Sequence, residues 1–590
     1  MRRFLGFALV VAWLAAGLRA AETPAARPGP AGAFDALARD YLKGYFAWRP
    51  PTASGLGFHE YDGRLTDFSR ESLAAELARL KDYDGRLGRF DTTGLDPEAR
   101  MNFLVLQTSI KREIFSFEEL KMFTRNPMTY AGAIDISPYI KREFAPLEQR
   151  AGSIVAILRQ APALFAAARA NLEDSLPKPF VETAIEQAEG AADFLAKDLA
   201  TALLPLKDAA LVAEFGRVNA AATNELRNFA AWLKTAKLPH AGGDYALGRA
   251  RYRKLIEYGE GLAAPPEDLL AIGLRELHRK QEVFAETARL IDPSRKPIEV
   301  FKAIQHDHPT AAGLIPDTAR NLEMIRRFVT DHQLVTIPSK VGARVAETPQ
   351  FLRATSFASM DCPGPFETKA TEAYYYVTPT EAEWPAAQKE EWLTAFNYYT
   401  TDIVSIHEVY PGHYVQFLCL KASAAPDLAK VFGSYAFIEG WAHYTEQLMV
   451  DEGFSGQEAG APADPLRAAK YRLAQTDEAL LRVCRLCASI QMHCQGMTVD
   501  QAARFFEENC YYEAKPARQE AIRGTFDPEY LYYTLGKLEI LKLREDYRRQ
   551  EGAGFTLQRF HDEMLRHGAP PLPLLRELLL KDPKIWPEAF

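Results

Sequence analysis

Residues 265–290 read PPEDLLAIGLRELHRKQEVFAETARL, a stretch in which apolar side chains recur at the spacing of a helix. Leu270, Leu274 and Leu277 stand at positions i, i+4 and i+7, so they share one face of an α-helix. The same periodicity recurs in five other segments, at residues 67–82, 95–122, 145–172, 178–203 and 208–236. Proline and glycine punctuate the stretches between them, and no fixed-period repeat is present. The pattern predicts a mostly α protein.

The helical pattern stops between residues 335 and 380, which hold several prolines and glycines. Within this stretch, the run Tyr374-Tyr375-Tyr376-Val377, followed by Thr378-Pro379, is typical of a short β-strand. Helical spacing resumes near residue 388 and continues with breaks to the end of the chain. No linker-like stretch divides the chain, so we expect one large helical domain over residues 33–590 with a small β element.

The first twenty residues differ from the rest. Arg2 and Arg3 precede an apolar run that is too short for a stable membrane span, and Ala20 offers a small residue before a cut. We therefore expect residues 1–20 to be a secretory signal peptide and the Pro/Ala/Gly-rich residues 21–32 to be a flexible leader. The mature protein is then exported, to the periplasm or the extracellular space. The alternative is an uncleaved membrane anchor; no cysteine follows the run, which argues against a lipid anchor there.

Composition narrows the classes of partner. The 590 residues are 47% hydrophobic with a formal net charge of −8, and no long basic run is present, so nucleic acid is not an expected partner. No other stretch approaches ~20 consecutive apolar residues, so we expect no membrane association after signal cleavage. Cys484, Cys487 and Cys494 fall near one stripe of a predicted helix, which favours buried thiols over a disulfide or a second metal site. Oligomeric state cannot be read from the sequence.

The segment 406–413, IHEVYPGH, places two imidazoles and a carboxylate within seven residues, a set that suits a hydrolytic zinc site. His407 and His413 are the predicted ligands, and Glu408 is the predicted base. Six residues turn a straight helix by about 600°, which leaves the second histidine ~120° from the first. We therefore expect Pro411 and Gly412 to deform the helix with a two-residue bulge, so that both rings can reach one ion.

A third ligand is expected downstream, in FIEGWAHYTE at residues 437–446. Glu439, His443 and Glu446 stand at i, i+4 and i+7 and share one helix face. We assign Glu439 as the ligand and expect His443 and Glu446 to orient the ligands from behind, with Glu446 as the ligand the alternative. Gly440 in a helix interior costs about 1 kcal/mol against alanine, so it predicts close approach to another backbone or to the metal.

Both motifs, HEVYPGHYVQ and EGWAHYTEQ, resemble the family known as domain of unknown function 885. The stretch HEYDGRLTDFS at 59–69 and residues 491–544 are also similar to it, so the resemblance covers most of the chain. It implies a zinc metallopeptidase of the gluzincin type, distantly similar to the thimet-oligopeptidase and Taq-carboxypeptidase families, with a deep helical cleft that favours short peptides. The two-residue insertion in the histidine motif leaves the alignment of His413 to inference.

The same resemblance implies further site residues. Gln491-Met492-His493 is similar to a family segment that ends in histidine, although Met497 stands where the family tends to have tryptophan. Arg523 and Tyr533 match a family R…Y-x-x-G pattern. Tyr533 is the expected oxyanion donor, and Arg523 or His493 is expected to hold a substrate carboxylate or carbonyl; packing in a helical bundle is the alternative for each. The predicted strand 374–377 either pairs with an extended substrate or is a plain core strand.

These assignments predict a zinc-dependent metallopeptidase with one zinc ion, a scaffold half at 33–334 and a catalytic half at 335–590. Glu408 takes a proton from the attacking water in this scheme, and a peptide is the expected substrate. A zinc hydrolase of a non-peptide amide or ester would use the same site. A non-catalytic metal-binding protein is the third possibility, and the intact Glu408 argues against it, because a structural zinc has no use for a base.

Overall fold

The computed structural model describes residues 29–590, apart from 351, 352, 354, 355 and 459. The predicted signal peptide and residues 21–28 of the leader lie outside the described residues. The leader prediction is wrong at its end, because Pro30 already begins helix α1. Proline suits this first helical position, where its missing N–H is not needed.

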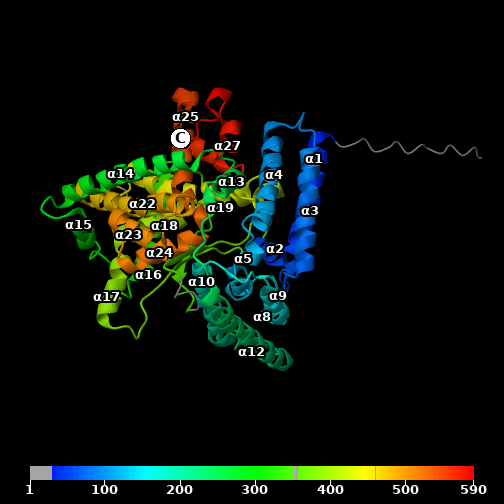
Figure 1. Ribbon diagram of the computed structural model, residues 1–590. Coiled ribbons are helices and arrows are strands. Elements are labelled where there is room, and N and C mark those ends of the chain that lie inside the picture. Colours follow the sequence, from blue (N-terminus) through cyan, green and yellow to red (C-terminus); the bar gives the residue numbers. More distant parts are fainter. Residues whose placement is uncertain (1–28, 351–352, 354–355, 459) are drawn as a thin grey trace, which may run out of the picture.

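The chain is mostly helical, as the periodicity predicts (Figure 1). The first helices along the chain are α1 Pro30–Trp48, α2 Pro50–Leu56, α3 Arg70–Gly88, α4 Pro97–Glu118, α5 Met122–Arg125, α6 Met128–Ala131, α7 Ser137–Lys141, α8 Leu147–Leu158, α9 Ala161–Asn171, α10 Lys178–Phe194, α11 Ala200–Ala202, α12 Ala209–Trp232, α13 Gly248–Glu260, α14 Pro266–Ile291, α15 Pro297–Ile304 and α16 Leu314–Asp331. Those after the sheet are α17 Ala386–Ala395, α18 Tyr398–Glu408, α19 His413–Ala422, α20 Asp427–Val431, α21 Tyr435–Asp451, α22 Pro465–Cys494, α23 Val499–Cys510, α24 Ala514–Phe526, α25 Tyr532–Glu551, α26 Leu557–Leu565 and α27 Leu572–Leu579.

The segment expected as one helix over residues 145–172 is two helices, α8 and α9. Pro162 stands in the first turn of α9, where a continuous helix would need its N–H and would clash with its ring. Together these helices form the one described stretch, Leu147–Asn171, that is long and apolar enough to cross a membrane. Half of its most apolar window is buried inside the protein, as in a core helix.

The β element is a three-stranded sheet of β1 Arg344–Glu347, β2 Ala358–Asp361 and β3 Tyr374–Val377. Its strand order is β1-β3-β2; β1 runs parallel to β3, and β2 runs antiparallel to it, with Met360 opposite Tyr375. The predicted strand is therefore the central one, and its backbone is paired on both sides. Of the two alternatives for this strand, a plain core strand is confirmed, and pairing with a substrate is excluded because strand addition needs a sheet edge.

The largest hydrophobic cluster holds the sheet and the C-terminal helices, and it starts at Leu277 on α14. Helices α14 to α16 therefore share a core with the expected catalytic half rather than with the scaffold half. Two other hydrophobic clusters form the cores of the N-terminal helices, one among α1 to α4 and one among α8 to α12. In Figure 1, α14 and α22 lie along each other, and α12 extends away from them.

Helices α21 and α25 cross at two glycines. A Cβ atom on Gly440 would lie 2.5 Å from the carbonyl carbon of Gly536, and a Cβ on Gly536 would lie 1.8 Å from the carbonyl oxygen of Ala436. Neither neighbour can move aside, because both are helix backbone. The expectation that Gly440 marks a close approach to another backbone is confirmed.

Candidate metal centre

The histidine motif spans a break between two helices. Helix α18 ends at Glu408, and α19 begins at His413. Between them the Gly412 N–H donates to the Ile406 carbonyl at 3.0 Å, and the Val415 N–H donates to the Val409 carbonyl at 3.4 Å, so the usual i−4 pattern is lost. The expected departure from a regular helix is present. Its form differs from a bulge, because the chain leaves one helix and starts a second at the ligand.

Two neighbours hold this break in place. A Cβ atom at position 412 would lie 1.7 Å from the His407 carbonyl oxygen, so only glycine permits the close return of the chain. From α21, the Trp441 indole N–H is 3.0 Å from the Pro411 carbonyl oxygen and 3.3 Å from that of Gly412. The second motif therefore braces the first through a buried tryptophan that follows Glu439 by two residues.

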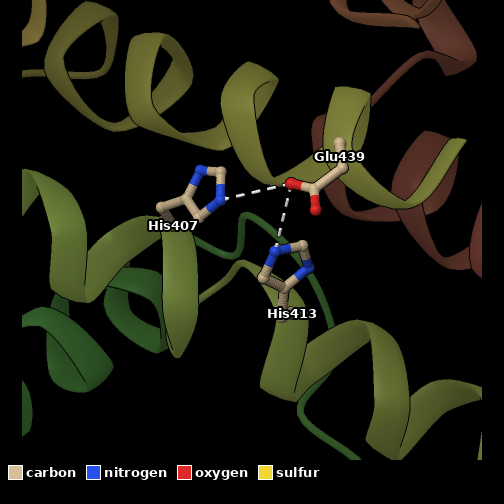
Figure 2. A group of neighbouring side chains, drawn as sticks. All are labelled: His407, His413 and Glu439. Carbon is tan, nitrogen blue, oxygen red and sulfur yellow. Dashed lines mark ion pairs between the residues drawn. The ribbon is translucent and has the colours of Figure 1, made fainter. Parts of the chain in front are cut away.

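His407, His413 and Glu439 converge on one point (Figure 2). The Glu439 Oε2 atom is 3.5 Å from the His407 Nε2 and 3.4 Å from the His413 Nε2. Zinc bonds of about 2.0–2.2 Å at a tetrahedral angle place two ligand atoms ~3.3 Å apart. The Glu439 Oε2 atom is buried and has no hydrogen-bond donor among the residues that the structure describes. A buried carboxylate oxygen without a donor between two imidazole nitrogens fits a cation, and these three residues could hold one zinc ion.

Glu446 lies behind the first histidine, not among the ligand atoms. Its Oε1 is 2.7 Å from the His407 Nδ1. If the Nδ1 carries the proton and donates to this carboxylate, the Nε2 lone pair is left to face Glu439 and His413. Both Glu446 oxygens are occupied, since Arg482 and His443 also contact them at 3.2 and 3.0 Å. The geometry therefore favours Glu439 over the alternative ligand.

The electrostatics agree with a charged site. Burial disfavours the imidazolium of His407, but the carboxylates of Glu439 and Glu446 outweigh it and raise the pKa of His407 to about 9. Burial likewise raises the pKa of Glu439, yet the two imidazoles hold it well below its usual range. A cation bound by these atoms would displace the proton of His407 and take over its role as counter-charge.

Two supporting residues escaped the sequence analysis. The Lys537 ammonium on α25 donates to the His443 Nε2 at 3.4 Å, so the His443 Nδ1–H faces Glu446. Burial and the Lys537 charge hold the pKa of His443 well below its usual range, which keeps the ring neutral. Arg482 on α22 balances the Glu446 charge. His443 thus orients Glu446 rather than a ligand directly. In the sequence, Lys537 and Arg482 stand out only as charged residues within largely apolar helical segments.

Glu408 lies on the open side of the site. Its Oε2 accepts a hydrogen bond of 3.0 Å from the Met360 N–H on β2. Met360 is opposite Tyr375 in the sheet, and its N–H points away from β3, so this edge of β2 faces the site. Glu408, His413 and Glu439 together line a cavity of about 410 Å³. The side chain expected to be the base therefore borders both the ligands and the space for a substrate.

Tyr533 lies beside the ligands. Its ring is stacked against that of His407 with centroids 6.5 Å apart, and Arg485 sits 5.2 Å from its centroid. Burial and the Glu439 charge raise the pKa of Tyr533, so its hydroxyl remains a proton donor at neutral pH. Arg523 does not contact the candidate ligands directly. Its guanidinium is paired with Asp527 at 2.8 Å and donates to the Tyr435 hydroxyl at 3.4 Å.

His493 does not belong to the site, which corrects the expectation that it binds substrate. The residue is 2% exposed, its Nε2 is 2.8 Å from the Gly524 carbonyl, and its Nδ1 accepts from the Leu247 N–H at 3.3 Å. Both ring nitrogens are therefore used by backbone. Burial lowers the pKa of His493 to about 4, so the ring is a neutral core group at physiological pH.

Replacing His493 with glutamine is expected to flatten the acid dependence of stability. The folded-state pKa of about 4 lies below the unfolded value of ~6.5, so the unfolded chain takes up the proton first as pH falls. The contribution of His493 to the free energy of unfolding is therefore fully present above pH ~6.5, and it is lost towards pH 4 by up to ~1.4 kcal/mol per pH unit. Urea denaturation at pH 7.5 and 5 should show a smaller loss in the variant than in wild type. The exposed His278 provides the control, and an unchanged pH slope would refute the assignment.

No curated protein matches this sequence. Two solved structures share the fold: a candidate lipoprotein of unknown function from Shewanella oneidensis, 23% identical with a TM-score of 0.75, and a candidate lipoprotein from Colwellia psychrerythraea, 18% identical with a TM-score of 0.75. The first match covers 92% of this chain and 99% of the other, and the second covers 95% and 100%. The sequence model of a family described as "Bacterial protein of unknown function (DUF885)" matches residues 50–579, so this chain belongs to that family.

Proposed function

We propose that this protein is a zinc-dependent metallopeptidase that binds one zinc ion through His407, His413 and Glu439. The observation that carries the proposal is the buried Glu439 oxygen, which lacks a donor and lies at zinc-ligand spacing from two imidazole nitrogens. Glu408 borders the same cavity. Three protein ligands plus a neighbouring carboxylate is the arrangement of a catalytic zinc site, which keeps one position open.

In this proposal, each protein group near the site has a chemical role. When bound, zinc would lower the pKa of a water molecule and polarise a carbonyl group. Glu408 accepts the proton of the attacking water and delivers it to the leaving amine. The Tyr533 hydroxyl donates to the oxygen that gains charge in the transition state. Glu446 keeps His407 in the tautomer that leaves Nε2 free, with its own charge balanced by Arg482.

The substrate in this proposal is a short peptide. The edge of β2 beside Glu408 faces the site, so an extended chain could align along it by strand addition through backbone groups other than the Met360 N–H, which donates to Glu408. The cavity of about 410 Å³ lies near the lower end of the range for small-molecule sites, ~300–1,000 Å³, and has no room for a folded chain.

We further propose a location in the bacterial envelope, periplasmic or extracellular. The proposal rests on the signal-peptide pattern of residues 1–20 and on the two solved relatives of the same fold, which are described as candidate lipoproteins.

The proposed zinc site is tested by measuring the zinc content of the purified protein. Wild type should bind one zinc per chain, and His407→Ala and His413→Ala should each lose it, because two remaining protein ligands hold zinc weakly. His278→Ala, in which an exposed histidine is removed, is the control.

Peptidase activity is tested on a mixed peptide library, whose products are identified by mass spectrometry with and without a chelator. Normal zinc content in both variants would exclude this site; zinc binding with cleavage of only non-peptide amides or esters, or of nothing, would exclude a peptidase.

A further inference from the structure

The cavity beside the ligands combines apolar walls with donors that have no partner. Its apolar lining comes from Met360, Phe417, Leu420, Val431, Ile438 and Ala569. Beyond the candidate catalytic groups, its lining includes the amide of Gln416, the ammonium of Lys430 and the thiol of Cys362. An apolar pocket with a few convergent polar groups is the usual form of a small-ligand site, in which the polar groups fix orientation.

Gln416 presents an unused donor. It lies on α19, one turn beyond His413, and is 7% exposed. Its buried Nε2 atom has no hydrogen-bond partner among the described residues. A buried amide donor without an acceptor costs about 1–3 kcal/mol, so a ligand that brings an acceptor oxygen would recover this energy.

Lys430 presents an unpaired charge. It lies in the last turn of α20 and is half-buried, and among the described residues that line the cavity it is the only lysine or arginine. No ion pair or hydrogen bond of its ammonium exists within the described part of the chain, whereas Lys421 on α19 donates to the Glu367 carbonyl at 2.8 Å. A half-buried lysine beside apolar walls is best satisfied by an anion, since a charge near an apolar surface is unfavourable unless it is paired.

We propose that this cavity binds the C-terminal residue of a peptide, with the terminal carboxylate on Lys430 and Gln416 and an apolar side chain against the walls. The inference rests on the proposed peptidase function and names its mode of action: removal of an apolar C-terminal residue. Hydrolysis breaks the last peptide C–N bond; the acyl carbon gains the water oxygen, and the released amino acid gains a proton on its nitrogen. A free N-terminal ammonium in the same place would face the Lys430 charge and be repelled.

The test compares N-acetyl-Ala-Ala-Phe with its C-terminal amide. The zinc-loaded wild type should cleave the free acid with at least a tenfold higher kcat/KM than the amide. In Lys430→Met this ratio should fall towards one, mainly through KM, because a charge-assisted hydrogen bond contributes ~1.5–3 kcal/mol, or about 10- to 150-fold. Lys430→Glu should favour the amide. Lys515→Met, at an exposed lysine on α24, is the matched control.

A binding measurement separates this inference from the proposed function. Calorimetric titration of zinc-loaded Glu408→Gln with N-acetyl-phenylalanine should show binding that Lys430→Met weakens at least tenfold. Binding without turnover of any peptide by wild type would refute the peptidase and leave the pocket. Cleavage of peptides with equal rates for acid and amide, or with internal products only, would overturn the pocket and leave the peptidase.

Discussion

Glu408→Gln is expected to reduce peptide hydrolysis by about a hundred- to ten-thousand-fold, the usual contribution of a general acid–base group. The amide keeps the volume and can still accept the hydrogen bond from the Met360 N–H, but it cannot take a proton. Zinc content should stay at one per chain, because Glu408 is not among the three converging ligands. The measurement is kcat/KM on a cleaved peptide alongside metal analysis.

The matched control is Glu391→Gln, at an exposed glutamate on α17. It should retain full activity. A Glu408→Gln enzyme with near-wild-type kcat/KM would show that another group moves the proton, and the mechanism proposed above would be wrong. Loss of zinc in the same variant would instead place Glu408 among the ligands.

Gly412→Ala is expected to lose zinc affinity by at least tenfold and to destabilise the fold. The added Cβ would lie 1.7 Å from the His407 carbonyl oxygen, and both are backbone-bound, so the return of the chain to His413 must open. Overpacking of this kind costs typically ~1–3 kcal/mol and often more where backbone must shift. His413 would then move away from His407 and Glu439. Zinc titration and thermal denaturation measure the two effects.

Gly216→Ala on α12 is the control for this variant. Outside its own helix backbone, no atom of the described residues lies within 4 Å of the Cβ that it would gain, so the substitution should be neutral or should stabilise the helix by up to about 1 kcal/mol. Normal zinc affinity in Gly412→Ala would mean that the tight return at Gly412 is not what aligns the two histidines.

The helical fold could be predicted from periodicity because long amphipathic stretches such as α14 and α12 repeat the same signal many times. The outer strands of the sheet could not. Arg344–Glu347 and Ala358–Asp361 are four residues each, and neither shows the alternation of a half-buried strand. Their pairing with the tyrosine strand is a tertiary effect. That pairing decides between the two roles expected for the predicted strand: it is the central strand, and β1 and β2 form the edges of the sheet.

The candidate ligands could be predicted because donor type and local spacing carry the information, and Glu446 behind His407 follows from the same helix face. Arg482 and Lys537 could not, since they reach the site from α22 and α25. His493 shows the opposite limit. The sequence of a family-like segment does not reveal whether the nitrogens of its histidine face a substrate. Here they bond two backbone groups of the core.

The crossing of α21 and α25 at Gly440 and Gly536 bears on thermal motion. Glu439 precedes one glycine directly, and Tyr533 lies one turn before the other. Because the two helices touch backbone to backbone there, with no side chain between them to change rotamer, we expect the crossing to be the point about which the helices move relative to each other. Fluctuations that rock one helix against the other grow with distance from a pivot. We therefore expect Glu439 and the Tyr533 ring to move together and by small amplitudes, even when the ends of both helices far from the crossing fluctuate more widely.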